Sequence, residues 1–255
     1  FERKLKEAQD ILDQSLEEGI KVMDYHDHHY PQYLKSIPDP PLVLYYKGTI
    51  LPRDYNAISI VGTRNASPDG KSRAFLLAQT CSKKLTVISG LAQGIDTEAH
   101  RGALAGGGRT IAVLAHGLDR VYPPSNKDMV PKITENGAVI SQFPIGTKPE
   151  GRNFPQRNKI IAGLALGVVV VEGGLRSGAL ITARFAREYG SEIIAYPGSP
   201  GDNNSSGPRS LIKEGAHYLS KPQEIEGIFT TLIDNSLYDK KLPDNPPGYL
   251  HVDMN

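Results

Sequence analysis

The chain has 255 residues, of which 29 are lysine or arginine and 28 are aspartate or glutamate, so its formal net charge is +1 at pH 7. A hydrophobic share of 39% with 22% charged residues is typical of a folded protein and excludes a disordered one. The longest apolar run, residues 160–171, is too short for the roughly 20 residues of a membrane helix, and the single cysteine excludes an internal disulfide and fits a cytoplasmic protein.

The first 54 residues differ from the rest of the chain. Residues 1–19 are charged, with apolar residues at helical spacing, and Gly19 predicts the end of an amphipathic helix. Two short apolar runs, residues 20–25 and 42–46, predict strands on either side of a proline-rich stretch. We therefore expect residues 1–54 to be a helical remnant followed by a turn-rich lead-in.

From residue 55 the pattern alternates between strands and helices. Strands are predicted at residues 57–62, 85–89, 109–115, 138–143, 167–171 and 192–196, and helices at 69–84, 94–105, 127–136, 154–165, 179–189 and 208–214. The strands are continuous runs rich in Ile and Val, as expected when both faces of a sheet are covered. Strict alternation predicts an α/β domain over residues 55–220, with a doubly wound, mostly parallel sheet.

The C-terminal end carries a weaker pattern. Residues 222–229 predict a short helix, and the rest of residues 221–255 has the polar, proline-rich composition of a linker. The chain also starts with phenylalanine rather than methionine. We therefore expect it to be a fragment of a longer protein.

Two glycine-containing loops follow the first strands of the predicted domain, where doubly wound sheets bind ligands. In the first loop, Gly62 and Thr63 precede Arg64, whose guanidinium suits phosphate. The second loop precedes a helix whose free N–H groups favour an anion, and its candidate residues are Ser89, Gly90, Leu91, Ala92 and Gly94. Neither loop matches a dinucleotide-binding fingerprint or a P-loop, so glycines that serve only turn geometry are the alternative.

Two further loops carry candidates for nucleic-acid binding. Phe154 opens a predicted helix that also carries Arg157 and Lys159, and single strands are bound by such combinations of aromatic and basic side chains. The alternative is that Phe154 only packs the start of its helix. The other loop indicates a phosphate cradle through Gly173, Gly174, Ser177 and Gly178.

The histidines near the N-terminus are candidates for a metal cluster. His26, His28 and His29 lie beside Asp24 and Asp27. No second ligand group lies at a useful spacing, so a polar loop before the Tyr-Pro pair at residues 30–31 is the favoured interpretation. We predict no metal site and no cofactor.

Three other residues are of types used in catalysis. His100 is expected to pack or to form a hydrogen bond on its helix, and Cys81 to be a small buried residue without a histidine partner. His116 follows a strand and could face the ligand crevice, but no nucleophile stands near it in sequence. We predict no catalytic residue.

Together, these loops resemble the DNA-processing protein A (DprA/Smf) family. The resemblance is carried by residues 59–64 (SIVGTR), 89–100 (SGLAQGIDTEAH), 117–123 (GLDRVYP), 154–164 (FPQRNKIIAGL) and 172–183 (EGGLRSGALITA). The proline-rich lead-in at residues 37–45 (IPDPPLVLY) is also similar to the segment that precedes the fold in that family. The resemblance covers about residues 20–220, with the motifs in the order of the family.

This resemblance implies an extended Rossmann fold that binds single-stranded DNA, protects incoming DNA in natural transformation and loads the RecA recombinase. It implies a homodimer without established catalytic activity, with Leu211 and Ile212 on the dimerising helix. Arg64 then matches a phosphate contact, Phe154 a base-stacking residue, and Arg157 and Asn158 the same DNA-facing stretch. The basic residue that the family places just before the phenylalanine has no clear counterpart, and Lys148 or Arg152 could serve. Many members also carry an N-terminal helical domain and a C-terminal winged-helix domain, and we expect neither to be complete in a fragment such as this one.

An enzyme is the second hypothesis. The Gly173-Gly174 turn also resembles the nucleoside-monophosphate hydrolases of the related Rossmann-like superfamily, which carry a glutamate on the helix after this turn. In this chain that helix has no acidic residue before Glu188, so the expected general acid or base is missing. Glu172 is a possible substitute, although a carboxylate that accepts hydrogen bonds from loop amides is the favoured role.

The charge is unevenly distributed along the chain. A net charge of +1 argues against a nucleic-acid binder, whose domains often have a pI above about 9. However, residues 58–190 contain 17 Lys+Arg and 9 Asp+Glu, whereas the two flanks together contain 12 and 19. Because the local field matters for DNA binding, the sequence predicts a basic crevice between acidic ends.

Overall fold

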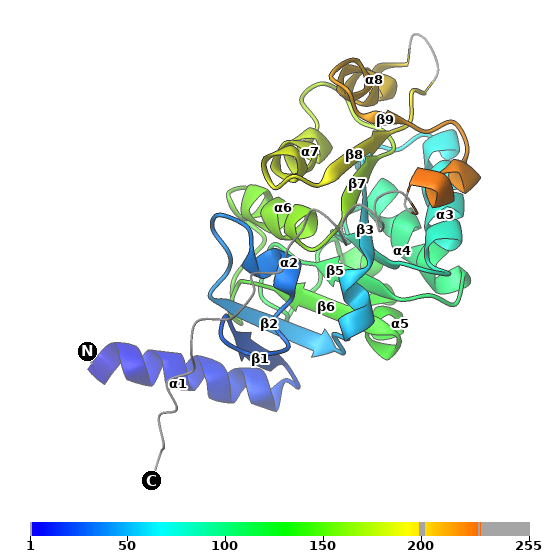
Figure 1. Ribbon diagram of the computed structural model, residues 1–255. Coiled ribbons are helices and arrows are strands. Elements are labelled where there is room, and N and C mark those ends of the chain that lie inside the picture. The colour runs from blue at the N-terminus through cyan, green and yellow to red at the C-terminus, as the bar shows by residue number, and fades with distance from the viewer. Residues whose placement is uncertain (1, 199–201, 229, 231–255) are drawn as a thin grey trace.

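The alternating strands and helices form one nine-stranded sheet within the part of the chain that the structure, a computed structural model, describes: residues 2–198, 202–228 and 230 (Figure 1). The strands are β1 (Lys21–Asp24), β2 (Val43–Gly48), β3 (Ala57–Val61), β4 (Thr86–Ser89), β5 (Thr110–Val113), β6 (Gly137–Ser141), β7 (Gly167–Val170), β8 (Glu192–Ala195) and β9 (His217–Tyr218). Their order in the sheet is β1-β2-β6-β5-β4-β3-β7-β8-β9.

The helices connect these strands and cover both faces of the sheet. They are α1 (Glu2–Glu17), α2 (Gln32–Lys35), α3 (Pro68–Cys81), α4 (Ile95–Ala105), α5 (Met129–Glu135), α6 (Asn153–Gly163), α7 (Gly178–Glu188) and α8 (Ser206–Lys213). The neighbours from β6 to β9 all pair in parallel. The predicted doubly wound, mostly parallel α/β fold is therefore confirmed.

Side chains alternate between two cores along the central strands. Ile58 and Ile60 of β3 point into a core shared with α3 and α4, whereas Ala57 and Val61 point into a core shared with α6 and α7. A third cluster packs α5 against the sheet through Met129. Because each central strand is buried on both faces, it has the continuous apolar sequence from which it was predicted.

The two strands of the lead-in extend this sheet at one edge. β2 pairs antiparallel with β6, with Tyr45 opposite Ser141, and β1 pairs antiparallel with β2. The short helix α2 and the two-residue edge strand β9 were not predicted, because both are too short to show a period. The predicted linker at residues 231–255 lies outside the described residues, and of the predicted helix 222–229 they include a 3-10 turn at Pro222–Glu224 and helix at 225–228.

A buried ion pair joins the start of β5 to the segment before β3. The Arg109 guanidinium donates to both carboxylate oxygens of Asp54, at 2.7 and 2.8 Å, and to the Thr49 carbonyl at 2.7 Å. Asp54 also accepts hydrogen bonds from the Thr86 hydroxyl and the Leu51 amide. All four hydrogen bonds that this carboxylate accepts come from groups of the protein, so we expect the loss of either charged partner to destabilise the fold.

Among the helices of the described residues, none combines the length and the apolar composition needed to cross a membrane.

Candidate nucleic-acid interface

A small pocket lies over the carboxyl ends of β3, β4 and β5, beside the start of α6. Its volume is about 80 Å³. The residues that line it are Arg64, Gly90, Ala92, Gln93, Leu114, Ala115, His116, Tyr122, Pro123, Phe154 and Arg157. The pocket thus combines the first three loops that the sequence marked as candidates, and His116 faces the crevice as expected.

An aromatic and cationic surface forms one side of the pocket. Phe154 is half-buried at the first turn of α6, and the guanidinium carbon of Arg64 lies 4.7 Å from its ring centroid. The exposed ring of Tyr122 meets Phe154 edge-on, with 6.3 Å between the ring centroids. An aromatic face beside an exposed guanidinium suits a base and its phosphate.

Tyr122 was not predicted as part of the site. In the sequence it is an isolated aromatic residue between a valine and a proline, far from Phe154 along the chain. Only the fold brings the loop after β5 against the start of α6. The available signal was an aromatic residue in a loop after a strand, at the carboxyl edge of the sheet.

Arg157 forms the floor of the pocket rather than an exposed phosphate contact. It is 5% exposed, and its Nη1 donates to the Val113 carbonyl at 3.0 Å. Gly90 has no side chain because a Cβ there would overlap this guanidinium. Burial lowers the pKa of Arg157, while the negative charge of Asp96 opposes that shift. Arg157 therefore supplies positive charge from beneath Phe154, whose ring centroid is 5.9 Å away.

The backbone amides of the second loop already have a partner within the protein. The carboxylate of buried Asp96 accepts from the Gly90 amide at 3.1 Å and from the Ala92 amide at 3.4 Å. Burial raises the pKa of Asp96, and the Arg157 charge and these two amides oppose that rise. The sequence predicted that the amides of this loop bind an anion. At Gly90 and Ala92 that anion is the carboxylate of Asp96.

The first and second loops are packed against each other. The Ile95 amide donates to the Thr63 carbonyl at 3.3 Å. Gly94 has a φ of +85°, and a Cβ there would overlap the backbone carbonyl of Thr63. This glycine therefore serves loop geometry, which was the alternative to ligand contact.

Glu172 ties the end of β7 to the start of α3. Its carboxylate accepts from the Ser67 amide at 2.9 Å and from the Ser67 hydroxyl, while Ser67 caps α3 through the Gly70 amide. The favoured interpretation, a carboxylate that binds loop amides, matches this geometry. In the loop that follows, the Gly173 amide donates to Asn204 and the Ser177 hydroxyl accepts from Ala179 at the start of α7.

The predicted DNA contacts differ in how far they are exposed to solvent. Arg64, Arg152 and Gly178 are exposed; Gly62, Thr63, Ala92, Phe154, Lys159, Gly174 and Ser177 are half-buried; Ser89, Gly90, Leu91, Gly94, Arg157, Asn158 and Gly173 are buried. Among the half-buried ones, Lys159 lies on the side of α6 that faces Asp39, to which its Nζ donates at 2.8 Å. The structure therefore separates Lys159 from Arg64 and Phe154.

Two other groups of predictions concern α6 and α8. The side-chain amide of Asn158 donates to the Gly178 carbonyl at 3.3 Å, which links α6 to α7. Arg152 pairs with Glu150 at the surface. Leu211, predicted at a dimer interface, is 7% exposed and packs in the core of its own chain, with Ile212 partly buried against the same core.

His100 and Cys81 both lie in the core, as the sequence predicted. Nδ1 of His100 lies 2.7 Å from the Thr110 hydroxyl, in the core between α4 and β5. Burial lowers the pKa of His100 to about 3, with the Arg157 charge acting in the same direction. Cys81 is buried and free, and burial raises the pKa of its thiol to about 12. Neither residue lines the pocket.

The pKa of His100 predicts a pH dependence of stability. The unfolded chain binds a proton at this side chain below its ordinary pKa of 6.5, whereas the folded chain does not until about pH 3. Stability should therefore fall as the pH drops below 6.5, by about 1.4 kcal/mol per pH unit for this group. Urea denaturation between pH 7 and 4 gives the free energy of unfolding at each pH. This free energy should fall less steeply with decreasing pH for His100→Asn than for the wild type. Equal pH dependence in the two proteins would contradict the lowered pKa of His100.

Comparisons with known proteins point to one family. The family model described as DNA recombination-mediator protein A matches residues 21–229. Protein Smf from Synechocystis sp. is 40% identical over 248 residues, which cover 94% of this chain and 62% of that protein. DNA processing protein DprA from Bacillus subtilis is 42% identical over 212 residues, with coverages of 82% and 71%. The chain thus spans about three fifths of the length of the first of these relatives.

Two solved structures share the fold. DNA processing protein A from Streptococcus pneumoniae matches with a TM-score of 0.78 and 40% identity, over 82% of this chain and 74% of that one. DNA processing protein A from Helicobacter pylori, described for its unique single-stranded DNA binding mode, matches with a TM-score of 0.73 and 28% identity, over 83% and 99%.

Proposed function

The chain belongs to the DNA recombination-mediator protein A family, and on that basis we propose that it binds single-stranded DNA at the pocket over β3, β4 and β5. The observation that carries the proposal is the position of Arg64 beside the ring of Phe154, at an edge where such sheets bind ligands. Bases stack on aromatic faces with little dependence on sequence, while cations track the phosphates. The single-stranded DNA binding described for the Helicobacter pylori relative supports this assignment.

We extend the proposal to the biological role. The chain protects incoming single-stranded DNA in natural transformation and loads the RecA recombinase, acting as a cytoplasmic homodimer and without catalysis. Residues 55–220 form the DNA-binding domain. The DNA-processing names of its relatives and the family description support this role.

Arg64 should contribute an electrostatic contact that does not depend on sequence. Arg64→Ala should weaken binding of all single-stranded oligonucleotides and reduce the slope of log affinity against log salt by about 0.7, which is one phosphate contact on a single strand. Fluorescence anisotropy at several salt concentrations measures both effects. Arg120→Ala is a matched control, because Arg120 pairs with Asp119 and does not line the pocket. An unchanged slope for Arg64→Ala would remove Arg64 from the site.

Hydrolysis of nucleoside monophosphates is the second candidate function. Glu172 is the carboxylate that could replace the missing acid on α7, but it is 6% exposed and occupied by Ser67. This bonding favours a structural role. Release of free base from nucleoside monophosphates, above background and abolished by Glu172→Gln, would revive the enzyme hypothesis.

A further inference from the structure

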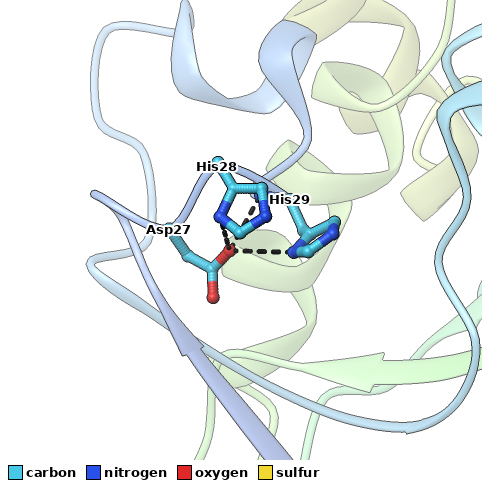
Figure 2. Close-up of side chains that lie close together, drawn as sticks. All are labelled: Asp27, His28 and His29. Atoms are coloured by element: carbon cyan, nitrogen blue, oxygen red, sulfur yellow. Dashed lines mark hydrogen bonds and ion pairs between the residues drawn. The ribbon is translucent and has the colours of Figure 1, made fainter.

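The turn after β1 brings three metal-ligating side chains together. Figure 2 shows an imidazole nitrogen of His28 and one of His29 facing the carboxylate of Asp27. Nδ1 of His28 lies 3.6 Å, and Nδ1 of His29 lies 3.3 Å, from Oδ1 of Asp27. All three atoms lie within 4.8 Å of one another. The sequence favoured a polar loop over a metal cluster at these residues, and the fold adds that three consecutive side chains meet on one tight turn.

The backbone of this turn is held by hydrogen bonds on both sides. The Asp27 amide donates to the Asp24 carbonyl at 3.1 Å, and the Tyr30 amide donates to the Asp27 carbonyl at 3.0 Å. The His29 amide donates to Oδ1 of Asp27 at 2.8 Å and so orients the carboxylate. Tyr30 is fully buried and anchors the turn through its hydroxyl, which donates to the Pro41 carbonyl at 2.6 Å. The backbone of the turn and the Asp27 carboxylate are therefore held in place before any ion arrives, while the two imidazole rings stay free to adjust.

These distances suit a tetrahedral ion. Around zinc, ligands at about 2.0–2.2 Å from the metal stand about 3.3–3.6 Å apart. The two separations from Asp27 fall at this value, and the two imidazole rings, whose centroids are 3.7 Å apart, are exposed enough to turn and close the third. We propose that Asp27, His28 and His29 bind one zinc-like divalent transition-metal ion, with water completing the coordination.

The donor set defines the class of ion. Two imidazole nitrogens and one carboxylate oxygen suit Zn²⁺, Ni²⁺ or Cu²⁺, whereas Mg²⁺ and Ca²⁺ require a shell of oxygens. The ion would fasten the turn between β1 and α2, at the edge of the sheet. None of the three ligands lines the pocket, so this site is independent of the proposed function.

Isothermal titration of the untagged chain with Zn²⁺ tests the site. We expect one ion per chain, an affinity at least tenfold lower for each of Asp27→Asn, His28→Ala and His29→Ala, and no competition from Mg²⁺. His26→Ala and His217→Ala are the controls: His26 neighbours the cluster without belonging to it, and His217 is an exposed histidine paired with Glu192. Zn²⁺ should also raise the thermal midpoint of the wild type and of both controls, but not of the three ligand variants.

Several results would overturn the proposal. These are no stoichiometric uptake of Zn²⁺ by the wild type, retention of full affinity in the ligand variants, or an equal loss of affinity in His26→Ala. A nitrogen NMR measurement adds a further check, since coordination should occur at Nδ1 of both histidines. The ligand variants should bind single-stranded DNA like the wild type, so a failed zinc site and a failed DNA site give separate outcomes.

Discussion

Replacing Arg109 by methionine should lower the free energy of unfolding by about 3–5 kcal/mol, the cost of breaking a buried ion pair from one side. The Arg109 and Asp54 side chains are 7% and 3% exposed, so water cannot replace the two hydrogen bonds that join them. The substitution leaves the Asp54 charge buried with only the Thr86 hydroxyl and the Leu51 amide as donors, and it deprives the Thr49 carbonyl of its partner. Urea denaturation monitored by circular dichroism measures the loss.

An exposed ion pair provides the matched control. Arg187 lies 2.8 Å from Glu214, but both side chains are nearly half exposed. Arg187→Met should therefore cost no more than about 1 kcal/mol, since exposed pairs are solvated and screened. If Arg109→Met cost as little as Arg187→Met, the buried Asp54 carboxylate would not depend on Arg109 for the compensation of its charge.

Replacing Phe154 by alanine should weaken binding of single-stranded DNA by about 1–3 kcal/mol, the range for one base stacked on an aromatic ring. This corresponds to a loss of affinity of about 5- to 150-fold. The half-buried ring lies close to both the Arg64 guanidinium and the Tyr122 ring, so its removal takes away the flat surface and the partner of the guanidinium. Anisotropy titration of a labelled oligonucleotide measures the effect.

The alternative role of Phe154, packing the start of α6, is separated by a second variant. Phe154→Leu keeps much of the apolar volume but removes the aromatic face. If stacking is the role, leucine should bind DNA nearly as poorly as alanine while unfolding at the wild-type urea concentration. If leucine restores DNA affinity, Phe154 is a packing residue and the base-stacking assignment is wrong.

The sheet could be predicted because its information is local. Strands such as β3 and β7 are buried on both faces and therefore appear as short runs rich in Ile and Val, and helices such as α3 begin at a capping serine. The edge pairing of β2 with β6 could not be predicted. It joins segments about 90 residues apart, and nothing in a short apolar run specifies its partner strand.

The site was predictable at the level of loops but not of atoms. Arg64 was assigned from its residue type in a loop after a strand and Phe154 from its position at a helix start. The fold brings the guanidinium carbon of Arg64 to 4.7 Å from the Phe154 ring centroid. The partners that the other candidates have within the protein could not be predicted from the sequence. Asp96 accepts hydrogen bonds from the Gly90 and Ala92 amides, and Asp39 pairs with Lys159. Such pairings depend on which side of a helix meets which loop, which is a property of the tertiary structure.

A comparison of single-stranded and duplex DNA of the same sequence tests the DNA-binding proposal most directly. Anisotropy titrations at several salt concentrations would compare the wild type with the double variant Arg64→Ala/Phe154→Ala. We expect the wild type to prefer the single strand, because only unpaired bases can stack on Phe154, and the double variant to lose that preference together with about one contact of salt dependence. Equal affinity of the wild type for duplex and single strand, or an unchanged affinity in the double variant, would contradict the proposed interface.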